Sequence, residues 1–410
     1  MKNDDRTTDS GTGTRLATAG RRPEWTGTAG HPSSVVNPPV WRASTHLYPD
    51  VAALKSGAQA SDETRFYYGR RGAPTQWALA EALTELEPGA AGTLLYPSGV
   101  AAIAGALLAL VKPGDHLLMA DNVYEPSRTL GRGLLTGFGI ETEFFDPLDS
   151  ESFARLIRPN TRAVLLEAPG SLTMEVPDIP AFAAIARERG VISLIDNTWA
   201  SLLGFPALER GCDIAIMSLT KHVGGHSDVM MGSVATGAAL YPKLRRTYLQ
   251  LGHVVSPDDA ALALRGLRTL QVRLERSTAS ALQIARWLAG RPEVAQVLCP
   301  MLPGAPGHET WARTFTGGCG LFSFLFRDGD EAARARFIDA LSLFGIGYSW
   351  GGFESLVVPV DPAGARSATA WPPPGVAPAD RLGVRLSIGL EEPADLIADL
   401  DRAFARMAGQ

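Results

Sequence analysis

Lys221 stands among residues whose types suit amine chemistry. It follows an apolar run, residues 213–217, that is typical of a buried strand, and the small hydroxyl residues Ser218 and Thr220 precede it closely. A lysine removed from water has a lowered pKa and becomes an amine nucleophile that can form a Schiff base with an aldehyde cofactor. An ordinary turn after a strand also uses Ser and Thr, so this segment alone leaves both interpretations open.

Asp196 supplies a second signal. It ends a β-rich run, residues 191–196, and a carboxylate at the end of a buried strand needs a cationic partner. The protonated pyridine nitrogen of pyridoxal phosphate (PLP) is such a partner. Asp196 and Lys221 lie about one strand-helix-strand repeat apart, so we expect both at the same edge of one sheet.

Two further segments suit the binding of a phosphate. Tyr68 and Arg70 in a glycine turn offer a phenol and a guanidinium, although a surface loop can have the same composition. Ser98, Gly99 and Val100 lie where an apolar strand stops and an Ala-rich helix begins, and exposed N–H groups at such a start bind anions. Many helices begin in this way, so the motif gains weight only beside the other residues.

Three residues suit the binding of a substrate. Arg385 is a lone cation in an apolar strand, residues 382–387, and a buried arginine needs an anion, either a distant glutamate or a ligand carboxylate. Trp350 is the indole of a loop of small residues that follows Tyr348. Tyr124 comes just after a strand candidate, where an ordinary half-buried tyrosine is an equally good interpretation.

The elements that must position these residues alternate along the first part of the chain. Strand candidates at 114–121, 142–146 and 162–167 are separated by helical patterns at 150–157 and 179–189. This alternation predicts a mostly parallel sheet covered on both faces, which binds ligands at the carboxyl ends of its strands. Four of the residues above fall at such ends, namely Ser98, Tyr124, Asp196 and Lys221.

The pattern changes after about residue 268. A long helix at 269–288 leads into a smaller region of mixed strands and helices. We expect strands at 294–298, 320–327 and 382–387, an amphipathic helix at 331–343, and a surface excursion at 366–378 with the run Trp-Pro-Pro-Pro.

His222, His226 and Asp228 follow the lysine with a spacing that a metal site could also have. The neighbouring glycines favour a loop over a rigid helix face. We therefore expect a structural segment here and no metal.

Together these motifs resemble the Cys/Met-metabolism family of PLP enzymes and, within it, the bacterial cystathionine β-lyases. The resemblance runs from about Gly20 to the C-terminus. It implies PLP fold type I (aspartate aminotransferase-like), an α/β fold with a mostly parallel sheet in a large cofactor domain and a smaller αβ C-terminal domain. The implied divisions are a flexible leader and extended arm that contacts a neighbouring subunit (1–72), a PLP-binding domain (73–268) and a C-terminal domain (269–410).

The resemblance also implies a role for each candidate residue. Lys221 would hold PLP and move protons, Asp196 would keep the ring nitrogen protonated, and Tyr124 would stack on the ring near the reacting carbon and the substrate. Arg385 would bind the substrate α-carboxylate with support from Ser349 and Trp350. The phosphate would be bound by Ser98, Gly99, Val100, Ser218 and Thr220, with Tyr68 and Arg70 from a neighbouring subunit.

Trp350 favours α,β-elimination of an amino-acid thioether, with L-cystathionine giving L-homocysteine, pyruvate and ammonia. Related γ-synthases and γ-lyases typically carry leucine at this place. Ala261 stands where the resembled β-lyases have a tyrosine near the far end of the substrate, and His222 replaces an aromatic residue often found after the lysine. A β-lyase for another cysteine S-conjugate, a γ-acting relative and a non-catalytic regulator with this fold therefore stay open.

Composition limits the partners and the cellular compartment that we expect for such an enzyme. The net charge of −5 comes from interspersed charges of both signs, which indicates neither nucleic acid nor a membrane surface as a partner. Cys212, Cys299 and Cys319 are scattered and odd in number, so we expect no disulfide framework and a reducing cytoplasm. The first thirty residues read as a flexible leader. The resemblance further implies a homotetramer of two catalytic dimers.

Overall fold

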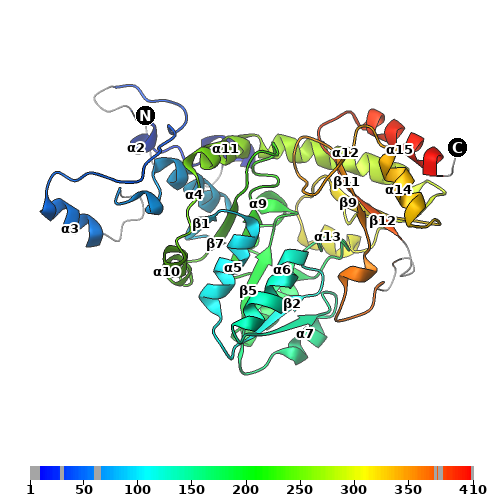
Figure 1. The fold of residues 1–410 in the computed structure, drawn as a ribbon, viewed down its shortest axis with the longest axis horizontal. Helices are drawn as coiled ribbons and strands as arrows, with labels where there is room; N and C mark the ends of the chain where they lie inside the picture. The colour runs from blue at the N-terminus through cyan, green and yellow to red at the C-terminus, as the bar shows by residue number, and fades with distance from the viewer. Residues whose placement is uncertain (1–9, 28–31, 60–65, 374–375, 377–381, 408–410) are drawn as a thin grey trace.

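The computed structural model describes residues 10–27, 32–59, 66–373, 376 and 382–407, and two β-sheets organise them (Figure 1). Within this part, the larger sheet contains β1 (Gly92–Tyr96), β2 (His116–Ala120), β3 (Glu141–Phe145), β4 (Thr161–Glu167), β5 (Ile192–Asp196), β6 (Ile214–Ser218) and β7 (Gly232–Thr236). The smaller sheet contains β8 (Val294–Leu298), β9 (Leu321–Phe326), β10 (Gly345–Ile346), β11 (Leu356–Val360) and β12 (Gly383–Ser387).

The helices fall into two groups. Those up to the end of the larger sheet region are α1 (Thr12–Thr18), α2 (Pro23–Thr26), α3 (Val51–Gln59), α4 (Pro74–Leu86), α5 (Gly99–Leu110), α6 (Glu125–Leu130), α7 (Ser150–Leu156), α8 (Ile179–Glu188), α9 (Ser201–Gly204), α10 (Tyr241–Leu251) and α11 (Pro257–Arg268). Those that follow are α12 (Leu270–Ala289), α13 (His308–Thr314), α14 (Glu331–Asp339) and α15 (Pro393–Met407). Single turns of other helix types lie at Gly69–Arg71, Gly131–Leu135 and Ala363–Ala365.

The larger sheet has the strand order β1-β7-β6-β5-β4-β2-β3, and it is parallel except for β7, which runs antiparallel to β1 and β6. Strands β2, β4, β5 and β6 are mostly apolar and buried along most of their length, as expected of parallel strands covered on both faces. Their carboxyl ends therefore meet at one edge. The predicted fold class, a mostly parallel α/β sheet with a second smaller region, is confirmed.

Helices pack on this sheet through their apolar faces. α8 buries Ile179, Phe182, Ala183 and Ala186, which share one face at helical spacing, and it packs on β5. The Asp178 side chain caps its start by accepting a hydrogen bond from the Ala181 N–H. α5 packs on β6 and β7, so the first turn of this helix lies beside the end of β6.

The smaller sheet has the order β10-β11-β12-β9-β8 and is antiparallel apart from the pair β10 and β11. Phe324, Phe326, Phe337 and Phe404 join its inner face to α14 and α15. The helix expected at 331–343 ends at Asp339. It ends early because the N–H groups of Ser342 and Leu343 donate to the Asp399 carboxylate on α15 instead of continuing the helix.

The N-terminal region differs from the flexible leader that we expected. α1 and α2 lie within the first thirty residues, and Leu16, Ala19 and Trp25 are buried because they share the apolar side of these helices against α4 and α11. Residues 1–9 and 28–31 of this leader lie outside the described residues. The following arm extends away from the sheets, with α3 at the far left of Figure 1.

Two other expectations concern the domain boundary after residue 268 and the excursion at 366–378. α11 ends at Arg268 and α12 begins at Leu270, so the expected boundary after residue 268 falls between two helices, while the division into domains stays a prediction. The excursion at 366–378 lies partly outside the described residues. Its described part is not simply a surface loop, because Arg366 and Trp371 are buried and Arg366 pairs with acidic residues of the larger sheet region. Across the described helices, none combines the length and apolar character needed to cross a bilayer.

Candidate active site

Lys221 lies in the turn directly after β6, at the carboxyl edge of the larger sheet. Its Nζ donates a hydrogen bond of 2.7 Å to the Ser349 Oγ and lies 5.4 Å from the centre of the Trp350 ring. Burial and the charge of Arg385 lower the pKa of the amine to about 8, while Asp196 acts in the opposite direction. The amine is therefore partly neutral near neutral pH and able to act as a nucleophile or base.

Asp196 ends β5 beside β6, and its carboxyl group is almost fully buried. Its Oδ1 accepts hydrogen bonds from the Thr198 Oγ1 at 2.5 Å and the Thr198 N–H at 3.1 Å. Burial raises the pKa of Asp196, against the effect of these bonds and of Lys221. Oδ2 has no hydrogen-bond partner within the described part of the chain, which leaves one carboxylate oxygen for a cation.

Thr198 is a residue that the sequence interpretation missed. Its Oγ1 also accepts from the Ser218 N–H at 2.9 Å, so one hydroxyl ties the end of β5 to the end of β6. The available signal was the spacing Asp196-Asn-Thr198, because Asp side chains commonly accept hydrogen bonds from the residue two positions on.

The start of α5 approaches the end of β6 closely. Ser98 is the N-cap of the helix and its hydroxyl accepts a hydrogen bond from the Ala101 N–H at 3.1 Å. A Cβ on Gly99 would come within 2.8 Å of the Ser218 Cβ, so only glycine allows this approach. Gly99 and Val100 are half-buried at the helix N-terminus, where N–H groups attract an anion.

Thr220 is placed differently from Ser218. Its hydroxyl donates to the Met231 carbonyl at 3.2 Å and accepts from the Met231 N–H at 3.0 Å. These bonds fasten the turn after β6 to the start of β7, so the hydroxyl of Thr220 already has a structural use. The Ser218 hydroxyl lies beside the helix start and makes no hydrogen bond to another described residue.

Tyr124 immediately precedes α6 and remains 42% exposed. Its N–H donates to the Glu167 Oε2 at 2.7 Å. Burial, Asp196 and Glu167 raise the pKa of the phenol, and Arg385 opposes this shift. The phenol therefore lies within electrostatic reach of three other titratable groups, Asp196, Glu167 and Arg385.

Glu167 also escaped the sequence interpretation, although it ends β4 as Asp196 ends β5. The two residues are register partners in the sheet. Burial and then the charge of Asp196 raise the pKa of Glu167 well above its usual range. The raised pKa favours the neutral form of this carboxyl group, which accepts the hydrogen bond from the Tyr124 N–H.

Arg385 lies within β12, between β11 and β9, and is only 8% exposed. Burial lowers the pKa of its guanidinium, while the phenols of Tyr124 and Tyr348 act in the opposite direction. No carboxylate pairs with it among the described residues, so the distant glutamate that we considered has no counterpart there. A buried guanidinium of this kind is suited to a ligand carboxylate.

Ser349 and Trp350 bring the C-terminal part of the chain to Lys221. Ser349 has φ +89°, a strained value for a residue other than glycine, and such strain collects at functional sites. The Trp350 ring packs edge-on against the His222 ring with centroids 5.2 Å apart. His222 donates through Nε2 to the Trp199 carbonyl, and burial lowers its pKa to about 3, so it serves as neutral support for the indole.

Comparison with known proteins shows to which family the chain belongs. A sequence profile described as Cys/Met metabolism PLP-dependent enzyme matches residues 24–405. The chain belongs to this family. It is 42% identical to cystathionine beta-lyase MetC of Escherichia coli K12 (96% of this chain, 98% of that protein) and 43% identical to cystathionine beta-lyase of Salmonella typhimurium LT2 (98% and 100%). The crystal structure of metB from Corynebacterium glutamicum superposes with a TM-score of 0.85 at 32% identity, covering 97% of this chain and 98% of that one.

The residues at the carboxyl edge fit the PLP of this family of enzymes. Lys221 offers an amine of lowered pKa, and Asp196 offers a carboxylate oxygen, Oδ2, to which no described residue donates. The start of α5 offers N–H groups beside Ser218. These are the three kinds of group that an aldehyde, a pyridine nitrogen and a phosphate require.

Tyr68 and Arg70 are not part of this group within a single chain. Arg70 donates to the Leu249 carbonyl at 3.0 Å and lines a separate cavity of about 310 Å³ with Trp77 and Tyr248. Tyr68 is 45% exposed. Their predicted contact with the PLP phosphate therefore requires a second subunit and stays a prediction.

Proposed function

We propose that this PLP-dependent enzyme is a carbon–sulfur β-lyase that cleaves L-cystathionine to L-homocysteine, pyruvate and ammonia. The observation that carries the proposal is the placement of the Lys221 amine between the Ser349 hydroxyl and the Trp350 indole. The relatives at 42% and 43% identity, both named cystathionine beta-lyase, support the same reaction.

The substrate would be bound through its α-carboxylate by Arg385, which otherwise stays buried without an acidic partner among the described residues. The Ser349 hydroxyl, which accepts from Lys221, would orient the amine toward the substrate Cα. Tyr124, whose backbone N–H donates to Glu167, would face the substrate near the reacting carbon. The three side chains thus come from both sheets.

PLP, when bound, supplies the electron sink that makes the α-proton of the substrate acidic. Asp196 favours that state by keeping a positive charge on the ring nitrogen. Lys221 takes the α-proton as a base and then gives a proton to the sulfur as the Cβ–S bond breaks. Homocysteine leaves with this proton, and the remaining three-carbon fragment takes up water to give pyruvate and ammonia.

The test is identification of the products by mass spectrometry after incubation of PLP-loaded protein with L-cystathionine. Homocysteine with pyruvate is the expected result. Cysteine with 2-oxobutyrate would instead identify a γ-lyase. No cleavage would overturn the cystathionine proposal, and a panel of other cysteine S-conjugates would then test the β-lyase for which Ala261 leaves room.

We also infer that two subunits complete each active site. The arm before α4 exposes apolar side chains in the single chain, with Leu47 94% exposed and Trp41, Val51 and Leu54 also exposed. Apolar exposure of this extent on one segment indicates a covered surface in the assembly. We infer that a neighbouring subunit covers this surface. In that assembly the arm of one subunit would place Tyr68 and Arg70 at the phosphate of the other. A tetramer of two such dimers remains the proposed assembly.

Subunit mixing tests this shared site. Arg70→Ala and Lys221→Ala should each be inactive alone, whereas co-expression should restore roughly a quarter of normal turnover. About half of randomly assembled dimers are mixed, and each mixed dimer has one site with an intact Lys221 and an intact Arg70. The two variants carry different tags, so that mixed assemblies can be isolated by two successive purifications and their turnover measured separately. Failure of the mixture to recover any activity would contradict a site shared between subunits.

A further inference from the structure

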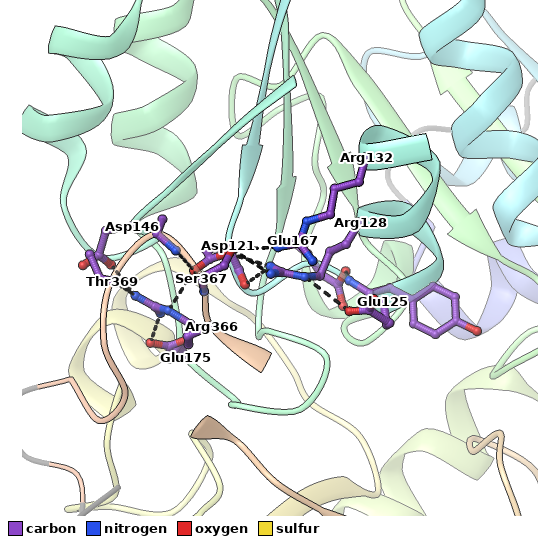
Figure 2. A network of polar contacts seen from close by, with 12 residues as sticks. Asp121, Glu125, Arg128, Arg132, Asp146, Glu167, Glu175, Arg366, Ser367 and Thr369 are labelled. Carbon is purple, nitrogen blue, oxygen red and sulfur yellow. Dashed lines mark hydrogen bonds and ion pairs between the residues drawn. The ribbon is translucent and has the colours of Figure 1, made fainter. Parts of the chain in front are cut away.

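A buried network of ions joins the C-terminal part of the chain to the loop that carries Tyr124 (Figure 2). Asp121 stands directly after β2 and its side chain is completely buried. It accepts hydrogen bonds from the Ser367 N–H at 2.5 Å, the Ser367 hydroxyl at 2.7 Å and the Ala368 N–H at 2.6 Å. Arg128 of α6 donates to it at 2.6 Å.

Arg366 extends the network beyond Asp121. Its side chain is 1% exposed and bonds to Glu175 and Thr369. It also pairs with Asp146 at 3.2 Å and with Asp121 at 3.5 Å. Figure 2 shows these carboxylates gathered around one guanidinium from separate segments. The residues 366–368 are therefore fastened to three loops at the carboxyl edge of the larger sheet.

Most charged atoms of this network have partners in spite of their burial, although Glu175 Oε2 and the Nε atoms of Arg128 and Arg366 make no hydrogen bond among the described residues. Burial alone would raise the pKa of Asp121, but the bonds from Ser367, Ala368 and Arg128 lower it below its usual value. Burial raises the pKa of Glu175, and Arg366 opposes that rise. Buried ions cost more desolvation energy than apolar residues of similar size, so a network of this kind can be retained for the unique geometry it enforces.

The geometry that the network enforces includes the backbone of Tyr124. The carbonyl of Tyr124 accepts hydrogen bonds from the N–H groups of Ser127 and Arg128, at 2.8 Å and 3.2 Å. Arg128 is in turn held by Asp121 through its side chain, which closes a ring of contacts across residues 121–128. Since Tyr124 is 42% exposed, packing alone does not hold its side chain, and the place of the phenol depends on this backbone.

We propose that Arg366 is a positioning residue for Tyr124, acting through Asp121 and Arg128. The inference rests on the proposed function in that it takes Tyr124 to face the reacting substrate. Segment 366–368 belongs to the same C-terminal region as Arg385 and Trp350, so the network fixes the phenol relative to the groups that bind the substrate carboxylate. Tyr124 and Arg385 then keep one separation throughout turnover.

The test compares Arg366→Met with a matched control, Arg291→Met. Arg291 also pairs with two acidic residues, Glu293 and Asp401, and its described side-chain contacts all lie in the C-terminal region. Two readouts are recorded for each variant. The first is hydrogen–deuterium exchange of peptides covering residues 121–130, which needs no turnover. The second is kcat for the thioether substrate. It is measured for each variant with Tyr124 intact and again in a protein that also carries Tyr124→Ala.

Arg366→Met is expected to raise exchange in 121–130 and to lower kcat by about tenfold to a hundredfold, because small displacements of a reacting group have effects of that size. With Tyr124→Ala the further loss caused by Arg366→Met should disappear, since no ring remains to be positioned. Arg291→Met should lower the melting temperature without either effect. If Arg366→Met does not fold, Ser367→Ala takes its place, with the same pattern at smaller size.

Unchanged exchange in 121–130 would overturn the proposal, as would an equal kcat loss with and without Tyr124. If the normal protein cleaves no thioether, the proposed function fails by itself. The exchange experiment still decides in that case whether Arg366 holds the Tyr124 loop.

Discussion

Lys221→Ala should lose turnover by about 10³-fold or more, because the same amine takes the α-proton and protonates the leaving sulfur. PLP should still bind non-covalently, since the start of α5, Ser218 and Asp196 remain. Turnover is measured by pyruvate formation, and bound PLP by its release in alkali. Lys112→Ala serves as the control because Lys112 is exposed and precedes β2, away from the carboxyl edge. Normal turnover by Lys221→Ala would remove the residue from the mechanism.

Lys221 should also carry a cost in stability that depends on pH. Its pKa falls from 10.5 in the unfolded chain to about 8 in the fold, so the unfolded state binds more protons between these values. Below pH 8 the buried charge destabilises the PLP-free protein by on the order of 3 kcal/mol, and this cost disappears as the pH rises toward 10.5. Lys221→Met should therefore raise the melting temperature at pH 7, with a gain that shrinks at high pH. A gain that stays constant with pH would contradict this origin.

Arg385→Met should raise KM by about 30-fold to a few thousand-fold, because leaving a buried carboxylate unpaired costs about 2–5 kcal/mol and each 1.4 kcal/mol is a factor of ten. PLP binding should be unchanged, since Arg385 contacts no group expected at the phosphate or ring nitrogen. Steady-state kinetics with L-cystathionine measure the effect. Arg313→Ala, which breaks a surface pair with Asp178, is the matched control and should leave KM unchanged.

The stability of Arg385→Met separates this role from a structural one. Breaking a buried ion pair costs about 3–5 kcal/mol, whereas removing a buried guanidinium that has no acidic partner among the described residues should leave the free energy of unfolding equal or higher. Urea denaturation of the PLP-free variants measures this difference. A large loss of stability together with an unchanged KM would assign Arg385 to the fold and not to the substrate.

The candidate residues that follow strands were predictable because their signals are local. An apolar run that ends in a polar residue marks the carboxyl end of a buried strand, as at Asp196 and before Lys221. In a parallel sheet such ends share one edge, so their meeting follows from the alternation of strands and helices. The antiparallel β7 was not expected, because the apolar pattern of a buried strand does not distinguish an antiparallel strand from a parallel one.

Contacts between residues that are far apart in the sequence were not predicted. Glu167 was visible only as the last residue of a strand, and its raised pKa comes from burial and from Asp196 in the next strand. Thr220 carries the same hydroxyl as Ser218, yet its rotamer directs it to Met231. Residue type alone does not distinguish these two directions.

The sequence by itself determined the chemistry of this protein: which amine, carboxylate and guanidinium are available, and that strand ends collect them. Only the tertiary structure decided which of these charges meet. Ser367 and Asp121 lie 246 positions apart, and the pairing of such segments depends on how two sheets pack, which no local pattern encodes. The same packing turned an expected surface excursion into the buried Arg366 network, because a desolvated guanidinium is stable only where acidic partners converge on it.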